Sequence, residues 1–264
     1  MINVGCTVVN LDDIETAAST GLDYLELMGK AVTALENEHF AELLRRVKQS
    51  VVPIRGMNGY CPAEIVMVGE VSQRDIKKYR EYAKKCSYRA AELGVEKVGI
   101  GSPASRQIPK GMDVSQALRQ MEEFLHVTAE EFAKYRICVC VEALATCYCN
   151  FINTTAGAYD IVERMNHPFI RLVIDFYNMD MMGEADIDLS SYLSKLVHVH
   201  ISDDENDVYK RSYLKKDRTQ IHQERLSKLF SIGYEETVSL EIDLPIEPKK
   251  LKESIQVIRT AISN

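Results

Sequence analysis

The chain has 264 residues, of which 46% are hydrophobic and 27% charged, an ordinary composition for a globular protein with a large core. Its net charge of −7 argues against a nucleic-acid partner, because phosphate binding needs a clustered positive field. Its first residues lack a secretory pattern, no apolar run approaches the ~20 residues of a membrane span, and seven scattered cysteines form no disulfide framework. We therefore expect a cytoplasmic protein with no membrane partner.

Short apolar runs alternate with longer amphipathic stretches along the whole chain. Runs rich in β-branched residues predict strands at 2–8, 24–27, 51–55, 97–101, 137–144, 170–176, 196–201 and 237–242. Helical periodicity predicts helices at 31–49, 73–93, 114–135, 218–230 and 250–262, and is weak at 181–195. Strand–helix alternation predicts a parallel sheet, and eight such units without a linker predict an α/β fold: a single (β/α)8 TIM barrel domain over residues 1–264. A doubly wound open sheet is the alternative.

The last four predicted strands have one apolar face and one face that becomes polar toward the C-terminal end. In the strand at 196–201, Val197 and Val199 share one face, and His198 and His200 share the other. The strand at 237–242 likewise sets Leu240 against Glu241. A parallel strand buried on both faces should be apolar on both, whereas a barrel strand can present polar groups to the mouth at its C-terminal end. This pattern favours the barrel.

Four polar residues end consecutive predicted strands on the inward face: Glu142, Asp175, His200 and Glu241. Three carboxylates and an imidazole suit a divalent cation, and they would repel one another in a small mouth without one. We expect one ion, Mn²⁺ by preference, with Mg²⁺, Co²⁺ and Zn²⁺ as alternatives. Taken singly, each residue could instead cap a helix or join a polar network. Their matching depth on consecutive strands favours the metal site.

The segment VEALATCYCNFINTTAGAYDIVERMNHPFIRLVIDFYNMD resembles the ketose 3-epimerases and related sugar isomerases of the xylose isomerase-like TIM barrel family. The resemblance rests on Glu142, the Asn-x-Ile-Asn-Thr run ending at Thr154, Asp175 and Met179. LVHVHISDDEND resembles the family's strand seven, whose second histidine, here His200, binds metal. VSLEIDLP resembles its last strand, whose glutamate is the fourth ligand, and GLDYLELM and VGIGSPASRQIP resemble its second and fourth strands.

The resemblance implies proton transfer beside a ketose carbonyl through a metal-stabilised enediolate. In ketose 3-epimerases two metal-bound glutamates act from opposite faces of the sugar, one removing a proton and the other returning one. By this resemblance Glu142 and Glu241 are the catalytic pair. The implied partner is a small sugar or polyol, and the family's habit of forming dimers or tetramers makes a homo-oligomer an open expectation.

Three positions depart from the epimerase pattern around the expected substrate. Asn178 stands where the family has a histidine, Tyr148 where it has an acid, and Asn206 where it has an arginine. Asparagine and tyrosine can still hydrogen-bond hydroxyl groups, but without charge. We take Asn178 and Tyr148 as candidate substrate-binding residues. Two inward strand residues, Glu26 and His198, are further candidates, with a structural role as the alternative for each.

The altered substrate shell leaves other functions open. A metal-dependent dehydratase of a keto-inositol or related polyol would use a similar site to eliminate water after the same proton removal. Hydroxypyruvate isomerase is a less supported relative, and a non-catalytic protein that kept the metal site is a further alternative. A barrel endonuclease acting at abasic DNA sites shares the fold, but it needs a histidine-rich trinuclear zinc site, and this acidic chain has only six histidines.

Overall fold

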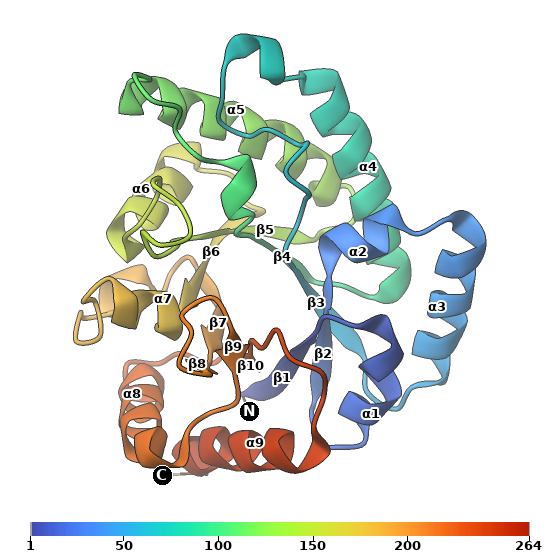
Figure 1. Ribbon diagram of the computed structural model, residues 1–264, viewed down its shortest axis with the longest axis vertical. Coiled ribbons are helices and arrows are strands. Elements are labelled where there is room, and N and C mark those ends of the chain that lie inside the picture. The colour runs from blue at the N-terminus through green and yellow to red at the C-terminus, as the bar shows by residue number, and fades with distance from the viewer. Residues whose placement is uncertain (1, 264) are drawn as a thin grey trace.

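The computed structural model describes residues 2–263 and contains a closed barrel of eight parallel strands. Figure 1 shows these strands at the centre of the molecule with the helices around them. The barrel strands are β1 (Asn3–Val8), β2 (Tyr24–Met28), β3 (Ile54–Asn58), β4 (Lys97–Ile100), β5 (Cys138–Glu142), β6 (Ile170–Asp175), β7 (Leu196–Ile201) and β10 (Thr237–Leu240). Their order around the barrel is β1-β10-β7-β6-β5-β4-β3-β2, which confirms the predicted TIM barrel and excludes the open sheet.

The helices between the strands cover the outside of the barrel with their apolar faces. They are α1 (Ile14–Ala18), α2 (Gly29–Ala34), α3 (Asn37–Gln49), α4 (Ile76–Leu93), α5 (Val114–Ala133), α6 (Thr155–Met165), α7 (Phe176–Met181), α8 (Thr219–Ser231) and α9 (Pro248–Ser263). Side-chain caps set several starts: Asp75 accepts from the Lys78 amide before α4, and Thr154 from the Gly157 amide before α6. None of the helices within 2–263 has the length and apolar content of a membrane span.

Three predicted elements differ from the structure. The third strand lies later than predicted, because Ser50 and Val52 form a turn that leaves Val51 92% exposed, and the strand begins only after Pro53. The single helix predicted at 31–49 is two helices, α2 and α3, separated by extended backbone at Leu35. The weakly helical segment at 181–195 is mostly loop with one short 3-10 turn at Ser190–Tyr192.

Glycines on the inward face make room for the polar side chains of neighbouring strands. A Cβ at Gly56 of β3 would lie 2.5 Å from Cγ of Glu26, and a Cβ at Gly101 would lie 2.6 Å from Oε2 of Glu142. Real Cβ atoms do not approach other atoms so closely, so a side chain at either position would displace the acid beside it. The barrel interior is therefore shaped around its buried carboxylates.

A short antiparallel hairpin follows β7 and lies at the mouth of the barrel (Figure 1). It consists of β8 (Asp203–Asp204) and β9 (Arg211–Ser212). Tyr148, in the loop after β5, and Tyr177, in α7 directly after β6, donate hydrogen bonds to the carbonyl of Val208 at the hairpin's turn. The hairpin thus lies across the segments that follow β5 and β6.

Candidate metal centre and substrate cavity

The C-terminal ends of four neighbouring strands place the four predicted ligands around one side of the mouth. Glu142 ends β5, Asp175 ends β6, His200 lies in β7 and Glu241 directly follows β10. One carboxylate oxygen each of Glu142 and Glu241 and one ring nitrogen of His200 all lie within 4.8 Å of one another. Asp175 is adjacent in register to His200 but lies outside this group. The structure therefore brings three of the four together.

The atoms of this group fit a divalent cation. Nδ1 of His200 and Oε2 of Glu241 are buried without a hydrogen-bond partner, and they lie 3.5 Å apart. Buried polar atoms are ordinarily satisfied, so an orphaned nitrogen beside an orphaned carboxylate oxygen is a natural place for an ion. Imidazole and carboxylate are the ligands that Mn²⁺, Zn²⁺ and Co²⁺ accept. Glu142, His200 and Glu241 would hold the ion.

The pKa values of the groups at this site are also those expected where a divalent cation would bind. Burial and the nearby Glu241 carboxylate raise the pKa of Glu142 to about 8. Burial opposes a charged ring at His200, yet Glu241 and Glu26 together raise the pKa of His200 to about 10. Without an ion, the cluster therefore holds extra protons at neutral pH, and a divalent cation would replace them.

Arg211 is the site residue that the sequence analysis missed. Its guanidinium comes from β9 of the hairpin, donates to the Asp175 carboxylate, and lies 3.2 Å from Oε2 of Glu241. It also donates to Oγ of Ser202 at 3.0 Å and lies 4.6 Å from the ring centre of Tyr177. Burial opposes ionisation of Asp175, but this guanidinium outweighs it and lowers the pKa of the carboxyl group.

The hairpin carries an arginine at a different position from the one expected from the ketose 3-epimerases. Asn206, which stands where ketose 3-epimerases have an arginine, is exposed near the hairpin's turn, and its amide is bonded to Asp204. Arg211 supplies a guanidinium from the returning strand instead. The signal in the sequence was the basic pair Lys210 and Arg211, which follows the acidic run at 203–207 after two intervening residues.

Of the predicted substrate-binding residues, Tyr148 lies at the mouth cavity, whereas Asn178 is 2% exposed and is not part of the lining of that cavity. The side-chain amide of Asn178 donates to Asp175 at 2.9 Å and to Glu142 at 3.3 Å, and its oxygen accepts from the Ala145 amide. Asn178 therefore links two predicted ligands. Tyr148 lines the mouth cavity and donates from its hydroxyl to the hairpin. Asn58, which the later position of β3 brings to the strand's end, donates to Glu241.

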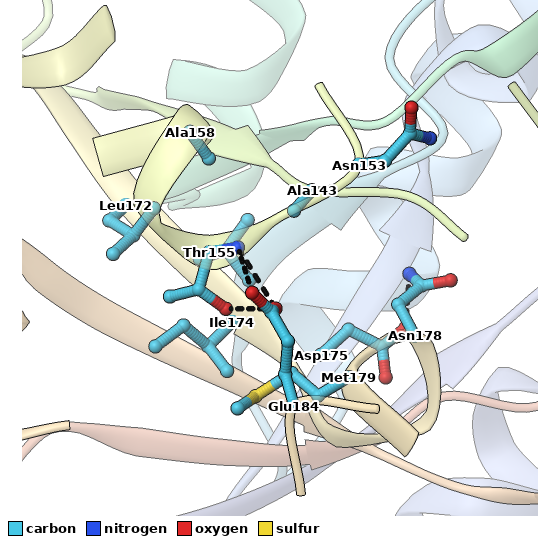
Figure 2. Close-up of a pocket in the computed structure, with 11 residues that line it drawn as sticks. Ala143, Asn153, Thr155, Ala158, Leu172, Ile174, Asp175, Asn178, Met179 and Glu184 are labelled. Atoms are coloured by element: carbon cyan, nitrogen blue, oxygen red, sulfur yellow. Dashed lines mark hydrogen bonds between the residues drawn. The ribbon is translucent and has the colours of Figure 1, made fainter. Parts of the chain in front are cut away.

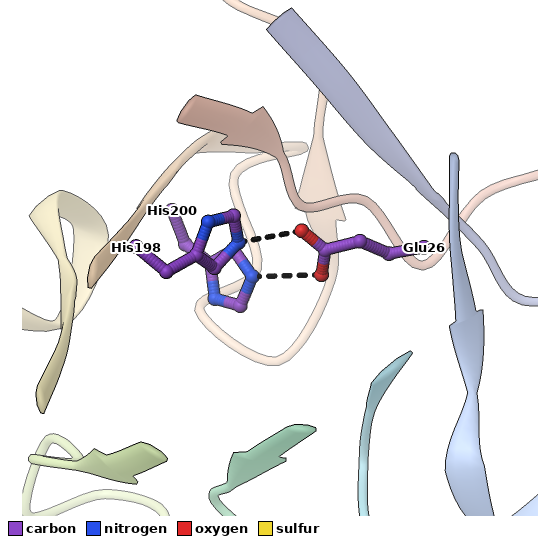
Figure 3. A group of neighbouring side chains, drawn as sticks. All are labelled: Glu26, His198 and His200. Atoms are coloured by element: carbon purple, nitrogen blue, oxygen red, sulfur yellow. Dashed lines mark hydrogen bonds and ion pairs between the residues drawn. The ribbon is translucent and has the colours of Figure 1, made fainter. Parts of the chain in front are cut away.

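The other two predicted substrate-binding residues lie behind His200, deeper in the barrel. Glu26 is 1% exposed and His198 is 4% exposed, and neither lines the mouth cavity. Figure 3 shows the Glu26 carboxylate facing both histidine rings, with Nε2 of His200 at 3.1 Å and Nε2 of His198 at 2.5 Å. Burial lowers the pKa of His198 to about 4, so its ring is neutral at neutral pH.

A cavity of about 460 Å³ opens beside the ligand group. Glu142, Tyr148, Arg211 and Glu241 form its polar side, and residues of the loops after β2, β3 and β4 form the other. This volume lies within the ~300–1,000 Å³ range of small-molecule sites. The cavity therefore suits a compact polar ligand held against the carboxylates.

The wall behind Asp175 is closed by a loop anchored on α6 (Figure 2). The Glu184 carboxylate accepts from the amide and the hydroxyl of Thr155 at the first turn of that helix, where a negative charge is favourable. The space enclosed there is only about 10 Å³, too small for anything beyond one water. The ligand group is therefore closed off on this side.

Arg106, in the loop after β4, is fully buried and fixes the end of β5. It donates to the backbone carbonyl of Glu142 at 2.8 Å and reaches that of Ile100 at 3.4 Å. It therefore joins the C-terminal ends of β4 and β5 beneath the ligand group.

A family model described as a xylose isomerase-like TIM barrel matches residues 14–261. The chain belongs to this family. A protein named inosose isomerase from Bacillus velezensis is 25% identical over 261 residues, which cover 94% of this chain and 88% of that protein.

Solved structures of epimerases and related proteins share the fold. The structure of L-ribulose 3-epimerase superposes with a TM-score of 0.78 at 14% identity, covering 100% of this chain and 96% of that one. The IOLI protein, solved with a bound zinc atom, superposes with a TM-score of 0.69 at 20% identity, covering 99% of this chain and 96% of that one. A structure named as a family 2 AP endonuclease from Brucella melitensis shares the fold as well, with a TM-score of 0.68 at 17% identity, covering 98% of this chain and 99% of that one.

Proposed function

We propose that the protein is a metal-dependent isomerase or epimerase that moves a proton next to the carbonyl of a small sugar or polyol. The observation that carries this proposal is the convergence of Glu142, His200 and Glu241 within 4.8 Å at the edge of a 460 Å³ cavity. The ion, Mn²⁺ by preference, would supply the positive charge that makes the proton next to a carbonyl acidic.

The two glutamates, both on the polar side of the cavity, would act as the acid–base pair. Glu142 ends β5 and Glu241 follows β10, and strands β6 and β7 lie between them around the barrel. Both side chains line the cavity, and burial raises the pKa of each in the metal-free protein. One glutamate can remove a proton while the other returns one, which is what inversion at a carbon requires.

The polar groups beside the glutamates would orient the substrate's oxygens. The Arg211 guanidinium presents several donors in a fixed plane, and the Tyr148 hydroxyl lies on the same side of the cavity. Asn58 and Asn178 hold the Glu241 and Glu142 carboxylates in place. This arrangement supports binding of a neutral polyhydroxy compound.

A cyclic keto-polyol is the substrate class that we favour within this proposal. The protein named inosose isomerase is similar to this chain over 94% of the chain's length, and inososes are ketones of inositols. An open-chain ketose is the second candidate, supported by the fold shared with L-ribulose 3-epimerase.

The test is incubation with a panel of inososes and ketoses in D₂O with Mn²⁺, followed by chelation of the metal and NMR of the products. We expect deuterium at the carbon next to the carbonyl together with a rearranged or epimerised product. Loss of water instead would show a dehydratase. No deuterium uptake with any member would contradict the proposal and favour a non-catalytic protein.

A further inference from the structure

A line of buried polar side chains runs up the inside of the barrel from its bottom to His200. Its members come from β4, β10, β7 and β2, and each is at most 8% exposed: Lys97, Thr237, His198, Glu26 and His200. Such a line is costly to bury unless its groups satisfy one another. Its contacts are hydrogen bonds except for the one between Nε2 of His198 and Glu26, which is an ion-pair contact of 2.5 Å.

The lower half of the line starts at Lys97, the first residue of β4. Its Nζ donates to Oγ1 of Thr237 at 2.8 Å and to the backbone carbonyl of Val197 at 2.9 Å. Oγ1 of Thr237 lies 2.7 Å from Nδ1 of His198, the residue paired with it in register between β10 and β7. The upper half passes through Glu26, whose two oxygens face Nε2 of His198 and Nε2 of His200 (Figure 3).

We propose that Lys97, Thr237, His198 and Glu26 form a one-way donor–acceptor relay that keeps a proton on Nε2 of His200 and leaves Nδ1 to bind the metal. The two ends that set the direction are chemically unambiguous. The ammonium group of a lysine only donates hydrogen bonds, and a carboxylate only accepts them. Every group between Lys97 and Glu26 must therefore accept from below and donate upward.

Each step of this direction follows from the contacts. The Thr237 hydroxyl accepts from Lys97, so its single proton is free to donate. Its other acceptor, the Val197 carbonyl, is 3.5 Å away and already accepts from Lys97, whereas Nδ1 of His198 is at 2.7 Å. Because Nδ1 of His198 accepts, that ring carries its proton on Nε2, beside Glu26.

The same carboxylate then fixes His200. Its second oxygen lies 3.1 Å from Nε2 of His200, which must be the donor because the carboxylate cannot be. Nδ1 of His200 is the nitrogen without a partner, 3.5 Å from Glu241. Groups that hold a metal-binding histidine by its other nitrogen orient the ring and raise its basicity.

Glu26, His198 and His200 could instead be read as a second metal site, since their ligand atoms also lie within 4.8 Å of one another. The contact between Glu26 and Nε2 of His198 is 2.5 Å. Two ligands about 2.0–2.2 Å from a shared ion stand more than ~3 Å apart in a tetrahedral site. The 2.5 Å contact therefore leaves these two atoms too close together to be ligands of one ion.

This inference rests on the proposed function only in taking His200 as a metal ligand. The decisive variant is Thr237→Val, which removes the hydroxyl at nearly constant volume, and Thr237→Ser is its matched control. Thr237 does not line the mouth cavity. Circular dichroism and thermal melting would establish that both variants fold.

The measurement is ¹⁵N NMR of histidine-labelled, Zn²⁺-loaded protein, together with Zn²⁺ affinity by calorimetry. In the wild-type protein and in Thr237→Ser we expect His198 and His200 both protonated on Nε2. In Thr237→Val we expect His198 to populate both neutral tautomers and Zn²⁺ affinity to fall at least about tenfold, as for other residues that support a metal ligand. Lys97→Met should shift His198 in the same direction.

Three outcomes would overturn the proposed series of contacts: a His200 protonated on Nδ1, two zinc ions per protein molecule, or a folded Thr237→Val protein with unchanged tautomers and affinity. Turnover plays no part in these measurements. If the protein binds one Zn²⁺ through Nδ1 of His200 but turns over no sugar or polyol, the proposed function is refuted. The inference about the contacts from Lys97 to His200 would still stand.

Discussion

The buried carboxylates of the barrel interior differ in whether the protein supplies a cationic partner for them. Asp175 is paired with Arg211, and Glu26 with His200, whose pKa is raised to about 10, so each of these carboxylates has a cationic partner within the metal-free protein. Glu142 has no cation within ion-pair distance among residues 2–263, and burial raises its pKa to about 8. An isolated buried acid of this kind is expensive to maintain and marks a functional position.

Replacing Glu241 with glutamine should remove one of the two proton-transfer groups and one metal ligand oxygen. We expect turnover to fall by at least about 10²-fold, the contribution of a positioned acid or base. The measurement is the initial rate on whichever substrate the panel identifies, at saturating Mn²⁺. Glu235→Gln, at an exposed acid before β10, is the matched control and should keep full activity. Undiminished turnover by Glu241→Gln would refute the role of Glu241.

Binding of the metal at pH 7 should release protons. Glu142, with a pKa of about 8, and His200, with a pKa of about 10, both hold a proton in the metal-free protein at that pH, and both must lose it to act as ligands. Apparent Mn²⁺ affinity should therefore rise with pH from 6 to 9. Calorimetry in two buffers of different ionisation enthalpy measures the protons released. Heats independent of the buffer would contradict this assignment.

At the scale of elements, the ends of the strands and the hairpin after β7 decide the shape of the mouth. The four predicted ligands lie at the C-terminal ends of β5, β6, β7 and β10, the end at which TIM barrels build their sites. The β8–β9 hairpin adds a cation from outside the barrel, since Arg211 reaches Asp175 and Glu241 across it. A metal ion that uses Asp175 must therefore compete with this guanidinium.

Replacing Arg211 with glutamine should raise the Mn²⁺ affinity of the metal-free protein. The guanidinium is a positive charge 3.2 Å from a predicted ligand oxygen in a buried site, where charge interactions are strong. We expect a gain on the order of tenfold, or about 1.4 kcal/mol. Calorimetric titration would measure it, with Lys210→Gln, at the exposed neighbouring residue, as the control. An equal or weaker affinity would mean that Arg211 does not compete for Asp175.

At the scale of the whole molecule, the ion would link strands in the C-terminal half of the barrel to one another. Glu142, His200 and Glu241 come from strands separated by up to two others, so one ion would bridge β5, β7 and the end of β10. Anything that binds only the folded state stabilises it by mass action. Metal removal should therefore lower the stability of the entire barrel.

Addition of Mn²⁺ at 100 times its dissociation constant should stabilise the chelator-treated protein by about 2.7 kcal/mol. For a domain of this size that corresponds to a rise in melting temperature of roughly 5–10 °C. Thermal melts with and without Mn²⁺ measure it. The double variant Glu142→Gln/Glu241→Gln should show no such rise, and a rise of the same size in that variant would place the ion elsewhere.

Periodicity in the sequence determined the barrel, because alternation of strand and helix is a local property that each segment carries by itself. It also predicted that Glu142, Asp175, His200 and Glu241 share a mouth, since strand parity and position at a strand's end suffice for that. Only the tertiary structure decided what surrounds them. Arg211 reaches Asp175 from 36 residues away, and Ser239 reaches Glu26 from 213. Such partners are chosen by closure of the barrel and by the path of the hairpin, which no local pattern records.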